Sequence, residues 1–212
     1  MMKETTIIKH LLAWLFINIW HLHSRAQIPV EISAGHAGYY YQHSFATRFD
    51  PEKSLGFFHT SSVLIPYDKK RGNEIMSQSY ISYAMSQRWT SGVGTIFTPV
   101  NRVRPSVFFQ YFHKGKTTSV LVYPRMDIWS DPNLELMGFI EYHGAANRPV
   151  NLYARFQYMT TWNRDGHSRS YQYARAGIDT GSKQFGLAAN FDQYGRFATN
   201  YSNFGLFMRK VF

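Results

Sequence analysis

The chain contains no cysteine, and beyond residue 26 it has no long run of apolar residues. Without cysteine, neither a disulfide framework nor a cysteine-ligated metal site can form. No stretch in this part of the chain approaches the roughly 20 consecutive apolar residues that a transmembrane helix needs. Charged residues are also few, at 17% of the sequence. These absences exclude a disulfide-stapled domain and, beyond residue 26, a helical membrane span.

Aromatic residues are abundant instead. They make up 17% of the sequence, with 15 Tyr and 17 Phe, although the mean hydropathy is only −0.34. A transmembrane β-barrel combines these properties because only alternate residues face lipid and aromatic girdles mark both interfaces. The three tryptophans after residue 26, Trp89, Trp129 and Trp162, lie near the ends of predicted strands, where such a girdle places them.

Residues 1–26 have the pattern of a secretory signal peptide. Lys3 precedes an apolar stretch from Ile7 to Trp20, and Ser24-Arg25-Ala26 places small residues at the two positions that a signal peptidase reads. A retained membrane anchor is the alternative, but the uninterrupted part of the stretch is too short for a stable span. We therefore expect cleavage after this segment and a single β-barrel domain over 27–212.

Beyond residue 26, apolar and polar residues alternate at period two, which indicates strands with two different environments. Turn residues such as Lys114-Gly115-Lys116 and Gly181-Ser182 separate the alternating segments, and none has a helical period. Single-chain bacterial barrels have an even number of strands. We therefore add Ile28–Ser33 to eleven countable strands and favour twelve, with ten as the alternative. The eleven strands cover roughly 36–48, 55–66, 75–87, 91–99, 106–111, 119–128, 134–143, 150–159, 168–180, 184–192 and 201–212.

The final segment, 201–212, alternates in the same way and ends on an aromatic residue. Its apolar face is interrupted by Lys210. This ending resembles the closing strand of bacterial outer-membrane β-barrels, and the resemblance covers the architecture of nearly the whole chain beyond residue 26. It implies an all-β, transmembrane antiparallel up-and-down barrel in the bacterial outer membrane. It also implies that the barrel assembly machinery recognises a terminal signal, comprising Phe204, Gly205, Leu206, Met208 and Phe212.

If the apolar faces contact lipid, the opposite faces line the lumen and carry charges of both signs. Unpaired charges in a confined interior are costly, whereas paired and hydrogen-bonded charges are tolerated. We therefore expect ion pairs that brace a narrow barrel, and inward aromatic residues such as Phe108 and Tyr123 favour a filled interior. A charged constriction that selects solutes is the alternative. The expected lumen network comprises Arg125, Asp127, Glu135, Glu141, His143, Arg155, Arg175, Asp179, Asp192 and Arg209.

Motifs for catalysis are sparse. Outer-membrane lipid-cleaving enzymes resemble one another in a His-x-Ser pair, whose spacing of two places both side chains on one strand face. His59 and Ser61 have this spacing and are the catalytic candidates, although no third polar residue can be assigned to them. His167 and Ser170 are predicted to lie on opposite faces. The histidines show no close ligand spacing, so we expect no metal and no cofactor.

The part of the chain after residue 26 retains 20 Lys and Arg against 12 Asp and Glu, a net charge of +8. We expect outer-membrane lipid, lipopolysaccharide phosphates and the assembly machinery as partners, and no nucleic acid, since the chain is predicted to be exported. The first hypothesis is a structural or passive small-solute channel without catalytic activity. The alternatives are an outer-membrane lipid-modifying hydrolase and a soluble periplasmic ligand-binding β-barrel. The soluble barrel would turn its aromatic face inward and its charges outward.

Overall fold

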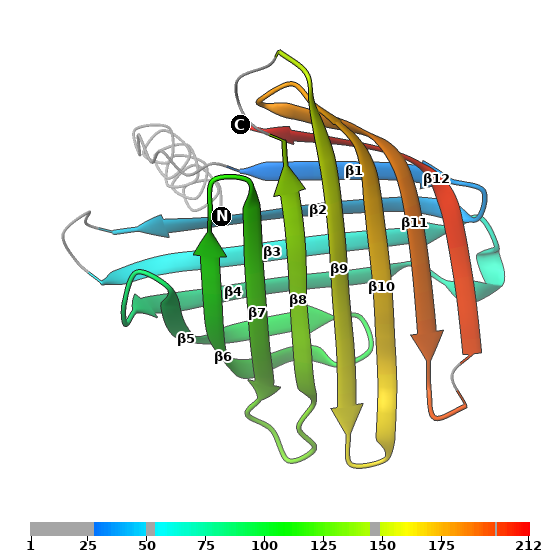
Figure 1. Ribbon diagram of the computed structural model, residues 1–212. Helices are drawn as coiled ribbons and strands as arrows, with labels where there is room; N and C mark the ends of the chain where they lie inside the picture. The colour runs from blue at the N-terminus through cyan, green and yellow to red at the C-terminus, as the bar shows by residue number, and fades with distance from the viewer. Residues whose placement is uncertain (1–27, 50–53, 145–148, 198) are drawn as a thin grey trace, which may run out of the picture.

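The computed structural model describes residues 28–49, 54–144, 149–197 and 199–212, and these form one closed antiparallel barrel of twelve strands. Neighbouring strands follow chain order, and the first strand pairs with the last. Figure 1 shows two walls whose strands cross steeply, as the tilt of strands in a closed barrel requires. The predicted up-and-down barrel is therefore confirmed. The strands are β1 (Pro29–Gly35), β2 (Gly38–Arg48), β3 (Leu55–Pro66), β4 (Glu74–Ala84), β5 (Trp89–Thr98), β6 (Arg102–Lys114), β7 (Thr118–Asp127), β8 (Leu134–His143), β9 (Asn151–Asn163), β10 (Gly166–Asp179), β11 (Lys183–Tyr194) and β12 (Thr199–Val211).

The barrel closes where β1 meets β12. The two strands pair from Pro29↔Val211 to Gly35↔Gly205, and Ile28 and Phe212 exchange backbone hydrogen bonds of 3.2 and 3.1 Å beyond them. The predicted strand near the start of the barrel domain is thus confirmed, which gives twelve strands and excludes ten. We call the end of the barrel with Ile28 and Phe212 the terminal end, and the opposite end the loop end.

Most predicted strand boundaries lie within a few residues of the observed ones. The prediction over 75–87 was too long, because β4 ends at Ala84. There the Ser86 hydroxyl accepts hydrogen bonds of 3.2 Å from the backbone N–H groups of Arg88 and Trp89, which closes the turn before β5. The predicted signal peptide lies outside the described residues.

A short 3-10 helix, η1 (Lys69–Arg71), lies between β3 and β4. The Asp68 side chain caps it by accepting a hydrogen bond of 3.0 Å from the Lys70 backbone N–H. No helix in the described part of the chain has the length and apolar character needed to cross a membrane.

The barrel is apolar outside and polar inside. On β11, Phe185 and Leu187 are 45% and 66% exposed, whereas Gln184 and Asn190 on the opposite face are each 1% exposed. This distribution follows directly from the period-two alternation. It contradicts the soluble-barrel alternative, which requires an apolar interior. The three tryptophans lie at or just beyond strand ends, as predicted: Trp89 begins β5, Trp129 follows β7, and Trp162 is one residue from the end of β9.

Aromatic side chains fill part of the interior. Tyr80, Phe108 and Tyr123 form one buried cluster on β4, β6 and β7, with Phe58 packed against it. A second contact crosses the lumen, because the Tyr40 ring of β2 lies 5.1 Å from the Tyr173 ring of β10 while β1, β12 and β11 separate these strands along the wall. These aromatic rings therefore narrow the open space inside the barrel.

Candidate functional site in the barrel lumen

Two cavities lie along the lumen. The larger, about 400 Å³, is lined at the loop end by residues of the β5–β6 connection, including Pro99 and Asn101. The smaller, about 110 Å³, is lined by residues of the terminal end, including Pro29 and Arg209. Some side chains border both cavities, so the two spaces adjoin. These shared residues define the neck: Gln42, Thr60, Met137 and Gln157.

The neck is built from two opposite walls and carries no charge. Gln42 and Thr60 come from β2 and β3, whereas Met137 and Gln157 come from β8 and β9. Hydrogen bonds hold three of these side chains: each glutamine bonds to a tyrosine hydroxyl at 2.8 Å, and Thr60 donates to a backbone carbonyl of β2 at 3.2 Å. Met137, with its flexible thioether, is therefore the member of the neck most able to change position.

Ion pairs line the loop-end side of the neck. Arg125 of β7 contacts Glu135 at 3.2 Å and is also paired with Asp127. Asn133 donates to Asp127 at 2.9 Å, and Arg104 approaches the same carboxylate at 3.6 Å. Arg125 and Asp127 are 3% and 2% exposed, so each buried charge has an opposite charge in contact with it, as its burial requires.

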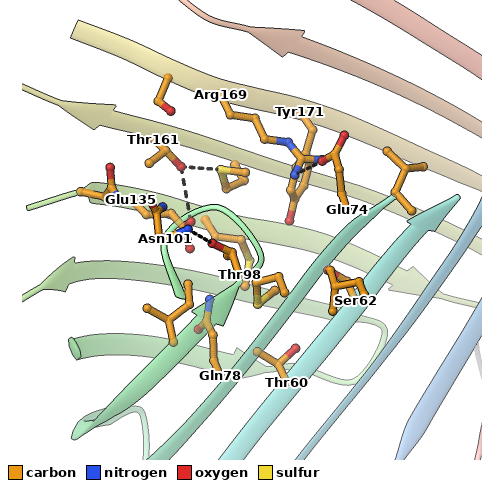
Figure 2. Close-up of a pocket in the computed structure, with 18 of the residues that line it drawn as sticks. Thr60, Ser62, Glu74, Gln78, Thr98, Asn101, Glu135, Thr161, Arg169 and Tyr171 are labelled. Atoms are coloured by element: carbon orange, nitrogen blue, oxygen red, sulfur yellow. Dashed lines mark hydrogen bonds and ion pairs between the residues drawn. The ribbon is translucent and has the colours of Figure 1, made fainter. Parts of the chain in front are cut away.

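A second set of ion pairs spans the mouth of the larger cavity. Arg169 of β10 contacts Glu74 of β4 at 2.5 Å and Asp192 at 3.0 Å. Five strands separate β4 and β10 in either direction around the wall, so the Arg169–Glu74 pair crosses the lumen. Tyr194 donates a hydrogen bond of 2.5 Å to Glu74. Figure 2 shows Arg169 and Glu74 reaching toward one another across the cavity, with Glu135 and Thr161 on the adjoining wall.

Glu31 of β1 joins two arginines on β9 and β10. Its carboxylate lies 2.7 Å from Arg155 of β9 and 2.9 Å from Arg175 of β10. Glu31 and Arg175 are each 2% exposed, and the Asn190 side-chain oxygen accepts a further hydrogen bond of 2.7 Å from Arg175. One carboxylate of β1 therefore balances two buried guanidinium groups.

The remaining charges gather at the terminal end. Arg209 contacts Glu141 at 2.9 Å, and Tyr153 donates to the same carboxylate at 2.7 Å. The His143 imidazole lies between Glu141 and Asp179, at 3.3 and 2.6 Å. This cluster connects β8, β9, β10 and β12 across the smaller cavity.

The structure places all ten residues of the expected lumen network on the inner faces of strands. Nine of them contact an oppositely charged group, and Asp179 contacts the imidazole of His143. These residues are Arg125, Asp127, Glu135, Glu141, His143, Arg155, Arg175, Asp179, Asp192 and Arg209. Four further members escaped the sequence analysis: Glu31, Glu74, Arg104 and Arg169. The alternation Val30-Glu31-Ile32 already signalled the first of these. The face of Arg169 was obscured by a register shift in β10 between His167 and Arg169.

The catalytic candidates His59 and Ser61 lie on the outer face of β3, among half-buried side chains of neighbouring strands. His59 bonds to the Ser79 hydroxyl at 2.9 Å, and Ser61 donates to the Met76 carbonyl at 3.0 Å. Each side chain thus bonds to a different group of β4, and the pair does not form a nucleophile–base contact of its own.

The prediction that His167 and Ser170 lie on opposite faces is wrong. The register shift in β10 turns them together, so that the His167 ring contacts the Ser170 hydroxyl at 2.8 Å and the Gly195 carbonyl at 2.8 Å. Ser170 is 7% exposed and donates to Thr160 at 2.9 Å. The hydroxyl is therefore covered, and the contacts join the start of β10 to β9 and to the β11–β12 connection.

Comparison with known proteins gives matches among solved structures. No protein-family model matches the chain, and no curated protein does. The NanC porin and the KdgM porin each superpose with a TM-score of 0.50 at 12% identity, covering 88% of this chain and 99% of the porin. The chain has the fold of these porins. Its fold is thus that of a bacterial outer-membrane β-barrel, and its outer apolar belt is the surface that faces lipid in such a barrel.

The residues of the predicted assembly signal lie on β12 or directly after it. Phe204, Leu206, Met208 and Phe212 are each at least 50% exposed. Gly205 pairs with Gly35 of β1 at the closure of the barrel. Their recognition by an assembly machinery stays a prediction.

Proposed function

We propose that the protein is a passive channel for small solutes in the bacterial outer membrane. The observation that supports this most directly is the pair of adjoining cavities along the barrel axis, which meet at the uncharged neck. A purely structural barrel has no need of such a path through its interior. The neck side chains are small or flexible enough that a modest rearrangement of Met137 widens the passage.

The charges along this path are balanced, which favours weak ion selectivity. The larger cavity is lined by three acidic and three basic residues: Glu74, Asp127, Glu135, Arg102, Arg125 and Arg169. The smaller is lined by two of each: Glu31, Glu141, Arg155 and Arg209. Because most of these charges are already paired, little net field remains to favour one sign of solute. We infer selection by size at the neck rather than by charge.

Substitution of the neck methionine tests the proposal. In planar lipid bilayers, Met137→Ala should raise the single-channel conductance at least twofold, and Met137→Trp should lower it, because both change the open cross-section at the neck. Met126→Ala on the lipid-facing side of β7 is the matched control and should conduct like the parent protein. If all four proteins conduct equally, or none conducts, the neck does not limit a solute path and the proposal fails.

We further propose that the chain is exported through its N-terminal signal peptide and that its exposed basic loop residues, including Lys69 and Lys70, contact lipopolysaccharide phosphates. Fractionation of cells should place the protein in the outer membrane, with a band that shifts between unboiled and boiled samples. Replacing both lysines by glutamine should weaken lipopolysaccharide retention without changing this shift. A protein recovered only from the periplasm would contradict the proposed location.

A further inference from the structure

A contiguous group of polar side chains lies on the outer face of strands β2 to β5. We call this group the polar patch: His43, His59, Ser61, Ser77, Ser79 and Thr95. Its members are neighbours in the sheet, since Ser61 pairs with both His43 and Ser77, and Ser79 pairs with both His59 and Thr95. The two imidazole rings stack with centroids 5.2 Å apart. The patch is therefore one continuous surface on one side of the barrel.

The patch lies at the middle of the lipid-facing belt. On β4, Ser77 and Ser79 fall between the exposed side chains of Ile75 near the loop end and Tyr83 near the terminal end. The corresponding outer surface of β8 to β12 is mostly apolar. Among its described residues Gln172 is polar, as are Thr160, Ser170 and Ser202 closer to the loop end. Its side chains at this level include Ile140, Ala154, Phe156, Ala174, Ala176, Leu187, Ala189 and Leu206.

Polar groups exposed to hydrocarbon are costly because lipid tails offer no hydrogen-bond partners. Some capacity of the patch is used internally, as in the His59–Ser79 contact of 2.9 Å and the Ser61 bond to a backbone carbonyl. A hydroxyl or a neutral imidazole can both donate and accept, so these single bonds leave further capacity at the surface. An occupant that supplies hydrogen-bond donors and acceptors at the middle of the membrane would satisfy this remaining hydrogen-bonding capacity.

We propose that the polar patch is a dimer interface occupied by the same patch of a second copy of this chain. A two-fold axis along the membrane normal keeps both copies at the same depth, so the polar group of one barrel meets the polar group of the other. Hydroxyls and imidazoles are self-complementary because each provides donors and acceptors. A lipid acyl chain has neither, and a lipid headgroup lies too far from the middle of the belt.

The dimensions of the surface fit such a contact. Four strands spaced about 4.8 Å apart, with about ten residues rising about 3.3 Å each, present a face of roughly 500 Å². This face includes the apolar and aromatic side chains around the patch, such as Tyr41, Phe45, Phe57, Ile81 and Val93. Two such faces bury about 1,000 Å² in total, which is the lower end of the range for specific protein interfaces. The inference depends on the proposed membrane location but not on channel activity.

Single-cysteine crosslinking provides the test, because the chain has no cysteine of its own. Ser79→Cys in the polar patch and the control Ala176→Cys, on the outer face of β10, are each oxidised in intact outer membranes. We expect a disulfide-linked dimer for Ser79→Cys at a yield at least tenfold above that of Ala176→Cys. A second variant, Ser61→Cys, is oxidised in the same way. Equal yields from Ser79→Cys and Ala176→Cys would overturn the interface, and so would the absence of a dimer from both Ser79→Cys and Ser61→Cys.

A variant without the polar groups separates a dimer from a patch that simply faces lipid. His43→Leu, His59→Leu and Ser79→Ala are combined, and the mass of the protein in lipid nanodiscs is measured beside the parent. We expect a dimeric parent and a monomeric variant. A monomeric parent whose variant is merely more heat-resistant would refute the proposal. Conductance per barrel is recorded for both, since loss of dimerisation with unchanged conductance distinguishes this inference from the proposed channel function.

Discussion

Glu31→Gln is the substitution that most directly tests the energetic role of the lumen charges. The wild-type carboxylate contacts Arg155 at 2.7 Å and Arg175 at 2.9 Å, and the three residues are 2%, 9% and 2% exposed. Glutamine keeps the size of the side chain and can still accept a hydrogen bond from one arginine. It removes the negative charge, however, and deprives two buried guanidinium groups of the carboxylate that contacts both of them.

Breaking a buried ion pair by removing one partner costs about 3–5 kcal/mol. For a chain of this size, each kcal/mol lowers the midpoint of thermal unfolding by about 2–4 °C. We therefore expect the transition from the folded to the unfolded band, measured by heating samples before unboiled electrophoresis, to fall by roughly 10 °C. The same variant should shift the ion selectivity of the channel toward anions, measured in a salt gradient, because the smaller cavity loses one negative charge.

Two controls accompany this measurement. Asp131→Asn removes a negative charge from an exposed residue in the β7–β8 connection and should leave the transition unchanged. Adding Arg175→Gln to Glu31→Gln removes one of the orphaned charges and should recover part of the lost stability. A transition for Glu31→Gln within about 1 °C of the parent would refute the reasoning, since it would show that Arg155 and Arg175 do not need this carboxylate.

Three further substitutions test the faces and the closure of the barrel. Leu187→Arg places a charge in the middle of the lipid-facing belt. It should destabilise the barrel by about 2–4 kcal/mol in denaturant titrations in lipid. The control Val100→Arg, in a connection and 89% exposed, should have no measurable effect on stability. Gly205→Ala puts a methyl group against the Ala34 carbonyl oxygen, so it should lower the yield of closed barrel on refolding, scored by the unboiled band. Trp89→Ala removes a ring stacked on the next strand and should cost about 1–2 kcal/mol in the same titrations, a loss that Trp89→Phe should largely restore. An unchanged stability of Leu187→Arg or Trp89→Ala would mean that the assigned faces are wrong. An unchanged refolding yield of Gly205→Ala would mean that the assigned closure is wrong.

The strand pattern was predictable because one physical rule acts on every strand. Lipid outside and water or ion pairs inside force successive residues into opposite environments. Apolar and polar residues therefore alternate along β9 and β11, and this alternation can be recognised without knowledge of the neighbouring strands. The short first strand was the difficult element. Its pattern covers few residues, and its assignment depended on the requirement for an even number of strands.

The site was only partly predictable, because its contacts join distant parts of the chain. Alternation places Arg155 and Arg175 on the inner face, but their partner Glu31 precedes them by 124 and 144 residues. The sequence around Arg155 and Arg175 does not indicate which carboxylate on other strands lies at the same position along the barrel axis. The neck depends on the same information, since it combines side chains of β2, β3, β8 and β9. The register shift near His167 likewise changes which side chains share a face, and period two cannot anticipate it.

The contacts of Glu31 also have a consequence for the order of folding. A half-formed barrel that includes β9 and β10 but has not yet joined β1 to β12 holds two arginines that lack the carboxylate which contacts both in the closed barrel. Such an intermediate gains little from partial collapse, because its interior cannot be completed until the first strand arrives. Loop-closure entropy already makes contacts between the two ends of a chain slow to form. The lumen therefore couples completion of the interior to closure of the wall, and intermediates that lack the β1–β12 contact are high in free energy.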